Sequence, residues 1–238
     1  MPEDIGDRLT HKAKLLQDTD WYVDRLYQWA TDLGAGMLVA NYSRFVIDLN
    51  RPPDNAALYT GHGTGLLPTQ CFDGSAVYQS GLQPDEQEKG RRLQNYWQPY
   101  HRQLRSSLDE IKKRHGYALL LDAHSILTEV PMLFDGKLPD LNLGTYRGSS
   151  ADCNLISACF SVLDQSTDYS AVLDGRFQGG YITRHYGQPQ EGIHALQLEM
   201  AQQIYMSERP PTYDPSLAAK VSATLRKLVS TLIQWSPR

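Results

Sequence analysis

Apolar residues recur along the chain at two spacings, and together these spacings predict an α/β protein. At 15–33 and 217–234 they recur at helical spacing, which is typical of amphipathic helices. A more charged helical pattern predicts a long helix at 84–115, bent or broken at Pro99. Residues 151–167 are also expected to form a helix.

Short apolar runs bounded by turn residues predict the strands. We expect short strands at 37–40 and 45–49, a core strand at 119–121, a strand edge at 139–145 and a strand at 194–200. In an α/β protein, strands of this kind deliver side chains to the carboxyl edge of the sheet, where sites form.

Residues 55–83 are rich in Gly, Thr, Pro and Tyr and show little periodicity. A stretch of this length is more typical of a functional loop over a site than of a linker. His62 lies within it, and we do not expect it to be a metal ligand.

The core strand predicted at 119–121 ends abruptly in Asp122, Ala123 and His124. His124 is our first candidate for a metal ligand, because its position brings an imidazole to the edge of the sheet. Asp122 could orient that imidazole through a hydrogen bond. The alternative is a core strand that merely ends in polar residues, and the spacing leaves both interpretations open.

The strand predicted at 194–200 alternates the polar residues His194, Gln197 and Glu199 with apolar neighbours. A carboxylate is costly to bury on a strand that enters the core. Beside a metal it could act as the general base for a water molecule. Glu199 is therefore our candidate catalytic residue.

Asn50 and Arg51 directly follow a predicted strand, and Arg44 precedes it. A guanidinium binds a carboxylate through paired hydrogen bonds, so we expect these residues to bind an acidic substrate. Alternatively, Arg51 forms a structural ion pair with Asp48 or Asp54.

Residues 175–187 contain paired glycines between Arg176 and Arg184. Glycine lets the backbone approach a ligand closely, so this stretch is expected to form a loop that grips the substrate. A glycine-rich hairpin with solvated arginines is the alternative.

Two aspartates, Asp18 and Asp20, stand at the entry of the first predicted helix. One of them could be the N-cap of that helix. Alternatively, one could turn into the site as a carboxylate metal ligand.

Composition narrows the class of protein. With 238 residues, of which 41% are hydrophobic, we expect a single domain over 1–238. The net charge of -4 argues against nucleic acid and anionic membranes as partners. The three cysteines lack Cys-x-x-Cys spacing, so we expect reduced thiols in the cytoplasm. No apolar run reaches the roughly 18 residues of a membrane span.

Several long motifs, in one order and over almost the whole chain, resemble the N-formylglutamate amidohydrolase (deformylase) family. They are Asp18-Thr19-Asp20-Trp21, Tyr42-Ser43-Arg44, Asp48-Leu49-Asn50-Arg51-Pro52-Pro53-Asp54, Asp122-Ala123-His124-Ser125, Asp140-Leu141-Asn142-Leu143-Gly144-Thr145, Gly179 to Gly187 and His194 to Glu199.

The resemblance implies a three-layer fold like that of the zinc carboxypeptidases and aspartoacylases, with a mixed, mostly parallel central sheet. It implies zinc or another divalent metal, with His124 and Asp20 as ligands and Glu199 as general base. The substrate would be N-formyl-L-glutamate, cleaved to formate and L-glutamate in the last step of a histidine-degradation route. Its carboxylates would be bound by arginine and amide side chains, namely Arg44, Asn50, Arg51 and Arg184.

Members of this family usually open with an apolar strand that ends in Pro-His-x-Gly, whose histidine would be the first metal ligand. We expect that strand to be lacking here, because the sequence opens with Met1-Pro2-Glu3. Weak metal affinity and low activity would follow, unless His62, His185 or His194 supplies the third ligand. The alternatives are an inactive or weakly active binder of acidic amino-acid derivatives, or an aspartoacylase-like deacylase of N-acyl amino acids.

Overall fold

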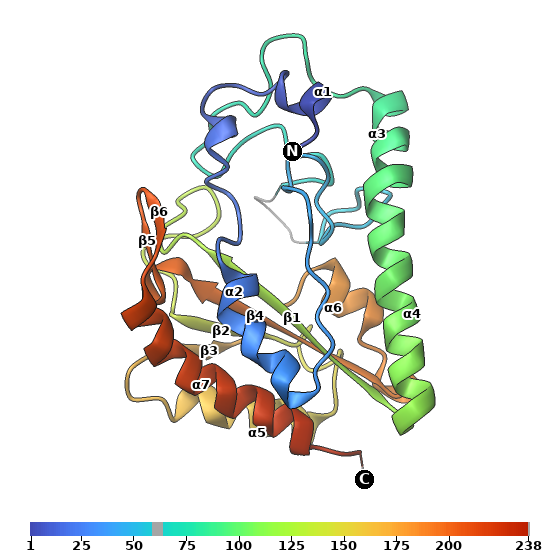
Figure 1. Cartoon of the computed structure of the whole chain (residues 1–238), viewed down its shortest axis with the longest axis vertical. Coiled ribbons are helices and arrows are strands. Elements are labelled where there is room, and N and C mark those ends of the chain that lie inside the picture. Colours follow the sequence, from blue (N-terminus) through green and yellow to red (C-terminus); the bar gives the residue numbers. More distant parts are fainter. Residues whose placement is uncertain (59–63, 238) are drawn as a thin grey trace. The chain divides into compact units, whose positions relative to one another are not determined.

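The computed structural model describes residues 1–58 and 64–237, so His62 lies outside the described residues. The chain folds into two compact units, which we describe separately (Figure 1). The first unit comprises Met1–Thr19, Ala40–Ser107 and Glu129–Gly136, and the second comprises Asp20–Val39, Leu108–Thr128 and Lys137–Arg238.

The second unit is built on a four-stranded sheet with the order β1-β4-β2-β3. Its strands are β1 (Ala118–Ile126), β2 (Leu141–Gly144), β3 (Ala171–Leu173) and β4 (Ile193–Ala201). The pairs β1–β4 and β2–β3 are parallel, and β2 runs antiparallel to β4. This mixed, mostly parallel sheet confirms the predicted α/β class and the three strands expected from 119 onward.

Helices and a hairpin complete the second unit. They are α2 (Val23–Tyr27), η2 (Gln28–Leu33), α5 (Cys153–Asp164), α6 (Tyr181–Tyr186), η4 (Pro189–Glu191), η5 (Gln202–Ile204), α7 (Pro215–Gln234) and the antiparallel pair β5 (Met206–Glu208) and β6 (Pro211–Tyr213). Asp152 caps α5 and Asp214 caps α7, each by accepting a backbone N–H of the first turn. The helices predicted at 151–167 and 217–234 are thereby confirmed.

Alternation along the strands divides the sheet into two faces. Leu196, Leu198 and Met200 of β4 belong to one apolar cluster together with residues of α2, α5 and α7. Figure 1 shows α5 and α7 lying along this side of the sheet. The other side carries the polar residues of β1 and β4 and is contacted by α6. Period-two patterning therefore separates the core from the polar face.

The first unit contains α1 (Glu3–Gly6), η1 (Ala13–Leu15), α3 (Glu86–Arg92), the π-helical turn η3 (Leu93–Trp97) and the start of α4 (Gln98–His115), within which the unit boundary falls. The long helix predicted at 84–115 is confirmed. Pro99 does not break it; the irregularity lies one turn earlier, at η3. A π-turn changes the hydrogen-bond register, which accommodates the missing N–H of a following proline.

The helix predicted at 15–33 is wrong in its first part. Leu16 and Tyr22 have positive φ angles of 52° and 61°, which no residue adopts inside an α-helix. Helical structure therefore resumes only at Val23, and the chain between Leu16 and Tyr22 turns twice.

The strands predicted at 37–40 and 45–49 are also wrong. Around Phe45 the backbone carbonyls accept hydrogen bonds from side chains instead of a neighbouring strand. Arg92 donates to the carbonyl oxygens of Phe45 and Val46, at 3.1 and 2.9 Å. The imidazole Nε2 of His101 lies 2.9 Å from the carbonyl oxygen of Leu49. Because buried carbonyls are satisfied in this way, the apolar run is buried without joining a sheet.

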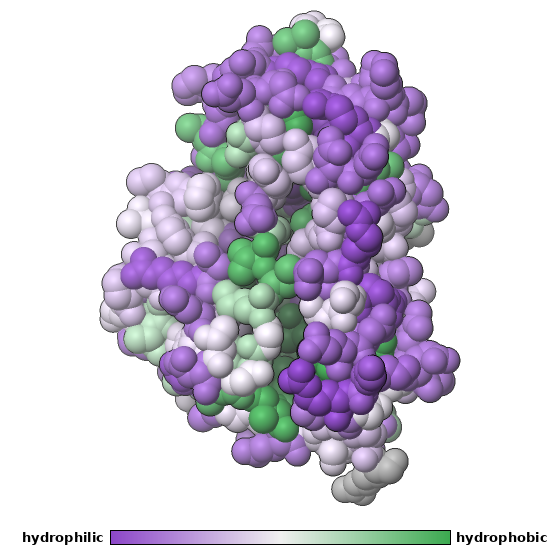
Figure 2. Space-filling view, turned by 45° about the vertical axis from the view of Figure 1, so that its right-hand side comes forward, coloured by the Kyte–Doolittle hydropathy of each residue, from purple (hydrophilic) through white to green (hydrophobic). Residues whose placement is uncertain are grey.

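Met37, Leu38 and Val39 are among the large apolar residues that remain exposed. Figure 2 shows a mostly hydrophilic face on which hydrophobic residues gather in patches. No helix in residues 1–58 and 64–237 is long and apolar enough to cross a membrane.

Gly144 of β2 permits a close backbone contact on the polar face of the sheet. A Cβ at this position would lie 2.5 Å from Gly179 N and 3.0 Å from the carbonyl oxygen of Phe177. Both neighbours are backbone atoms and cannot rotate away, so only glycine fits here.

We predict that Gly144→Ala lowers the free energy of unfolding by about 1–3 kcal/mol, as overpacking does. Gly90→Ala is the matched control, because nothing lies within 4 Å of a Cβ added in that helix. It is expected to stabilise the protein by about 0.4–1 kcal/mol. Urea unfolding of both variants tests this, and an unchanged midpoint for Gly144→Ala would contradict the close contact.

Candidate active site

The polar face of the second unit's sheet brings candidate residues together from three strands. In the register, His124 of β1 is opposite Glu199 of β4, which is in turn opposite Asn142 of β2. One row earlier along β1, Asp122 pairs with Gln197. Paired residues project from the same face of a sheet, so these side chains form one surface.

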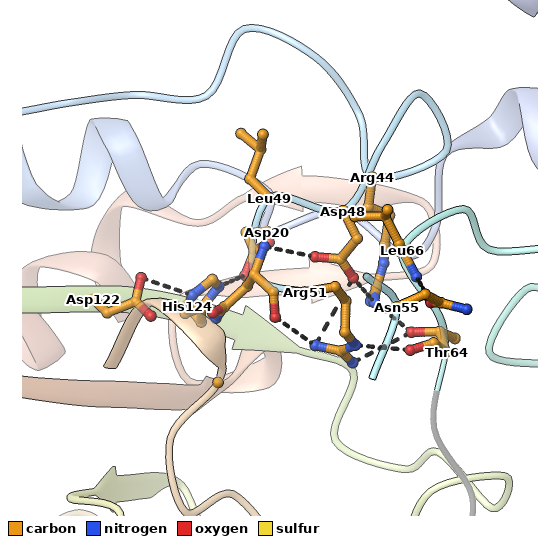
Figure 3. A network of polar contacts seen from close by, with 12 residues as sticks. Asp20, Arg44, Asp48, Leu49, Arg51, Asn55, Thr64, Leu66, Asp122 and His124 are labelled. Atoms are coloured by element: carbon orange, nitrogen blue, oxygen red, sulfur yellow. Dashed lines mark hydrogen bonds and ion pairs between the residues drawn. The ribbon is translucent and has the colours of Figure 1, made fainter. Parts of the chain in front are cut away.

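His124 lies between two carboxylates (Figure 3). Its Nε2 is 3.0 Å from Asp122 Oδ1, and its Nδ1 is 3.2 Å from Asp20 Oδ1. Asp122 is nearly buried and also accepts a 3.4 Å hydrogen bond from Thr183 of α6. Asp20 keeps 47% of its side chain exposed and could therefore be reached by a ligand. The predicted trio of Asp20, Asp122 and His124 is brought together.

Asp20 is held at the end of β1 by the backbone. The N–H of Ser125 donates to Asp20 Oδ1 at 2.7 Å. The Tyr205 hydroxyl lies 2.7 Å from both the carbonyl oxygen of Trp21 and the Ser125 hydroxyl, which ties the chain beside Asp20 to the same strand. These contacts explain how a residue distant in sequence reaches His124.

Neither Asp18 nor Asp20 caps helix α2, whose N-cap residue is Tyr22. Asp18 belongs to the first unit, where its carboxylate accepts a 2.8 Å hydrogen bond from the N–H of Phe72. Burial raises the pKa of Asp18 to about 6, partly offset by that hydrogen bond and by Arg44. The N-cap interpretation is therefore wrong for both residues.

The charge on His124 follows from its surroundings in the metal-free protein. Burial by itself lowers the pKa of an imidazole. The charges of Asp122 and Asp20 outweigh burial and raise the pKa of His124 well above its usual value. Without a metal, the ring is accordingly an imidazolium that donates to both carboxylates.

The His124–Asp20 pair has a spacing that suits a metal ion. Two ligands about 2.0–2.1 Å from a tetrahedral zinc lie roughly 3.3 Å apart. The separation of 3.2 Å between His124 Nδ1 and Asp20 Oδ1 matches this value. Asp122, 3.0 Å from Nε2, stands where a carboxylate would orient the imidazole if a metal bound at Nδ1.

A complete ligand set is not found in the described part of the chain, where no group of three His, Cys, Asp or Glu could hold a metal. His185 stacks on Tyr181, with ring centroids 4.8 Å apart. His194 Nδ1 lies 3.1 Å from the backbone nitrogen of Asp152 and accepts its N–H. Neither histidine joins His124 in such a group.

Glu199 is buried at 7% relative exposure. Gln197 extends its side chain to it, with Nε2 3.3 Å from Glu199 Oε2. Asn142 donates to the backbone carbonyl of Glu199 at 3.1 Å, while its own buried Oδ1 finds no hydrogen-bond partner among the described residues. The predicted base thus stands in a buried row of amides.

Arg184 also belongs to the second unit, on α6. Its Nε donates to the Gly179 carbonyl at 2.7 Å, and its guanidinium lies 4.9 Å from the centre of the Tyr146 ring. The glycine-rich stretch predicted as a loop becomes helical from Tyr181 onward. The turn before α6 fixes Arg184 near the polar face, since the N–H of Gly180 donates to Gln197.

Arg44, Asn50 and Arg51 belong to the first unit. Figure 3 shows Arg44 and Arg51 beside Asp48. Arg44 forms an ion pair with Asp48, and Nη1 of Arg51 lies 4.0 Å from the same carboxylate. Arg51 also donates to the carbonyls of Thr64 and Asn50, at 2.7 and 2.9 Å. Burial raises the pKa of Asp48, but both arginine charges outweigh it, so this pKa is lowered. Substrate binding by these three residues stays a prediction.

Comparison with known proteins identifies the family of the chain. A family model described as N-formylglutamate amidohydrolase matches residues 1–206. The chain belongs to the N-formylglutamate amidohydrolase family. The N-formylglutamate deformylase of Pseudomonas putida is 50% identical over 232 residues, covering 97% of this chain and 87% of that protein. The N-formylglutamate deformylase of Pseudomonas aeruginosa is 49% identical over 228 residues, covering 95% of this chain and 86% of that protein. The chain is accordingly an amidohydrolase.

Solved structures support the fold of this amidohydrolase. The crystal structure of N-formylglutamate amidohydrolase from Ralstonia eutropha JMP134 matches with a TM-score of 0.82 at 22% identity, covering 98% of this chain and 89% of that one. A gene product of Agrobacterium tumefaciens matches with a TM-score of 0.57 at 16% identity, covering 81% and 70%. At these identities the likeness concerns the fold alone.

The sequence pattern missed several residues of the amidohydrolase's polar face. Asn142 and Thr183 have no ligand-like spacing in the sequence, and only the folded chain brings them to this face. Tyr205, which belongs to the apolar cluster and hydrogen-bonds to Ser125, was missed for the same reason. Gln197 carried a usable signal, because it stands two positions before Glu199 on a strand and must share its face.

We predict a pH-dependent contribution of His124 to the stability of the metal-free protein. The pKa of histidine in the unfolded chain is about 6.5. Because the pKa of His124 is higher in the folded protein, its contribution to stability is complete below about pH 6.5 and is lost as the pH rises through the pKa of the folded state. His124→Gln should therefore be destabilised most between about pH 5 and 6.5, with the gap closing at higher pH. Urea unfolding in the presence of a chelator measures it.

His115→Gln, at the exposed end of α4, is the control for losing a histidine. This variant should show the same pH dependence of the free energy of unfolding as the wild type. A stability gap for His124→Gln that does not change with pH would show that the ring is not charged between the two carboxylates.

Proposed function

We propose that this chain is a metal-dependent N-formylglutamate deformylase, which hydrolyses N-formyl-L-glutamate to formate and L-glutamate. In a cell this reaction would complete a route that degrades histidine. The two Pseudomonas relatives are named for this activity, and they are 50% and 49% identical to this chain over most of its length.

One observation in the structure supports the proposal above all. His124, with Asp20 at 3.2 Å, is opposite Glu199 in the register of β1 and β4. A candidate metal ligand and a buried carboxylate therefore emerge side by side from one face. This is the arrangement that amide hydrolysis by an activated water molecule requires.

His124 and Asp20 would hold the metal, with Asp122 orienting the imidazole. When bound, zinc supplies a Lewis acid that polarises the formyl carbonyl and lowers the pKa of water. Glu199 takes the proton from the attacking water and passes it to the amide nitrogen as the C–N bond breaks. The reaction consumes one water molecule and releases formate and L-glutamate.

Arg184 is proposed to bind a carboxylate of the substrate. Its Nε is engaged by Gly179 and its guanidinium by Tyr146, so the side chain is pre-oriented. Pre-orientation lowers the entropy lost when a carboxylate binds. N-formylglutamate has two carboxylates, and Arg44, Asn50 and Arg51 remain the candidates carried by the family resemblance.

A second candidate is a binder of acidic amino-acid derivatives with little or no catalysis. It is favoured by the incomplete ligand set among the described residues. An N-acyl deacylase of the aspartoacylase type would share the chemistry but differ in the acyl group that it accepts.

We predict that the purified protein releases formate from N-formyl-L-glutamate and acts far more slowly on N-acetyl-L-glutamate and N-acetyl-L-aspartate. Dialysis against a chelator should abolish turnover, and added zinc should restore it, because the metal activates the water. Coupled formate detection and metal analysis measure both effects. Faster release of acetate would support the deacylase, and tight binding without turnover would support the binder.

We predict that Glu199→Gln lowers kcat by about 10²- to 10⁴-fold, since it removes a base but almost no volume. KM should stay within about threefold, because binding of the ground state is unaffected. Glu191→Gln is the control, an exposed glutamate with 68% of its side chain accessible. Wild-type turnover in Glu199→Gln would remove this residue from the mechanism.

A further inference from the structure

Gln197 connects two parts of the proposed site through one side-chain amide. On one side, the N–H of Gly180 lies 2.7 Å from its Oε1. On the other side, its Nε2 lies 3.3 Å from Oε2 of Glu199. The residue is 3% exposed, so bulk water cannot replace either contact.

The orientation of this amide is determined by its partners. A backbone N–H can only donate, so the atom that faces Gly180 must be the carbonyl oxygen. The NH₂ group is then directed at Glu199, where a carboxylate can only accept while it is ionised. The hydrogen bonds therefore run in one direction, from Gly180 through Gln197 to Glu199.

Gly144 makes this connection possible. It is the β2 residue opposite Gln197, and a Cβ there would lie 2.5 Å from Gly179 N. Without a side chain on β2, the turn at Gly179 and Gly180 can lie directly on the sheet and reach the amide. The same turn accepts the Nε hydrogen bond of Arg184 through the Gly179 carbonyl.

We infer that Gln197 is a positioning residue for the reaction: it holds the carboxylate of Glu199 in one rotamer and fixes its place relative to the turn that carries Arg184. This inference rests on the proposed function, in which Glu199 is the general base. In this role Gln197 acts through its contacts with Gly180 and Glu199.

The physical reason is the freedom of a glutamate side chain. Glu199 has rotatable bonds whose freedom must be lost before its carboxylate can accept a proton from a water molecule. A displacement of about 1 Å of a catalytic group can reduce the rate about 100-fold. A buried donor on Oε2 restricts that displacement before substrate arrives. Gln197 therefore acts on kcat through Glu199 and only weakly on KM.

The test is a double-mutant cycle on N-formyl-L-glutamate with wild type, Gln197→Met, Glu199→Gln and the double variant. Gln197→Met keeps the length of the side chain and removes both hydrogen bonds. We expect kcat to fall about 10- to 100-fold with KM changed less than about threefold. In the Glu199→Gln background the same substitution should lower kcat less than about twofold, because the residue it positions is already gone.

Two further variants separate positioning from loss of structure. Gln197→Glu keeps an acceptor for Gly180 but puts a second carboxyl group beside Glu199. The two carboxyls repel or share one proton, so this variant should lose kcat like Gln197→Met even where Gln197→Met folds poorly. Ser150→Ala is the matched control, since it removes a buried 2.7 Å hydrogen bond to Ala195 of the same strand without touching Glu199. It should lower the unfolding midpoint and leave kcat within about twofold.

The outcomes distinguish this inference from the proposed function. An active wild type with unchanged kcat in both Gln197 variants overturns the inference alone. Equal losses in the wild-type and Glu199→Gln backgrounds do the same, because they show that Gln197 does not act through Glu199. A wild type without hydrolase activity overturns the proposed function and this inference with it. The expected pattern, a loss of kcat only when Glu199 is present, supports both.

Discussion

A shift of one residue between β1 and β4 would turn His124 and Glu199 to opposite faces of the sheet, because the side-chain period of a strand is two. The observed register keeps them on one face, opposite each other. The apolar side holds this register: Leu196, Leu198 and Met200 pack into the core, and a slip of one residue would turn them out of it. The hydrophobic effect on one face thus determines the chemistry on the other.

Hydrogen bonds offset the cost of burying the polar face. Glu199, Gln197 and Asn142 are all nearly buried, and an unsatisfied group there costs about 1–3 kcal/mol. The Gln197 amide accepts from Gly180 and donates to Glu199, whereas Asn142 Oδ1 has no hydrogen-bond partner in the part of the chain that the structure describes. An acceptor without a partner beside a candidate base is a place for a water molecule or a substrate N–H.

Patterns in the sequence predicted what depends on local periodicity. The strands at 118–126 and 193–201, the long helix and the last helix follow from alternation and helical spacing. The run at Phe45 looked like a strand because strand and buried coil have the same apolar composition. Its hydrogen-bond partners, Arg92 and His101, lie more than 40 positions away, and no local pattern reveals them. Asp20 was reached by family resemblance, since its contact with His124 spans 104 positions.

The two carboxylates beside His124 determine how a cation could bind. Asp20, Asp122 and an imidazolium together leave one negative charge unbalanced, and the raised pKa of His124 keeps its proton in place. A divalent cation would have to displace the proton from Nδ1, while the proton on Nε2 stays with Asp122. The resulting set of two carboxylates, neutral imidazole and cation is electrically balanced. Binding would then be coupled to proton release, so the arrangement that stabilises the metal-free protein also makes its metal affinity depend on pH.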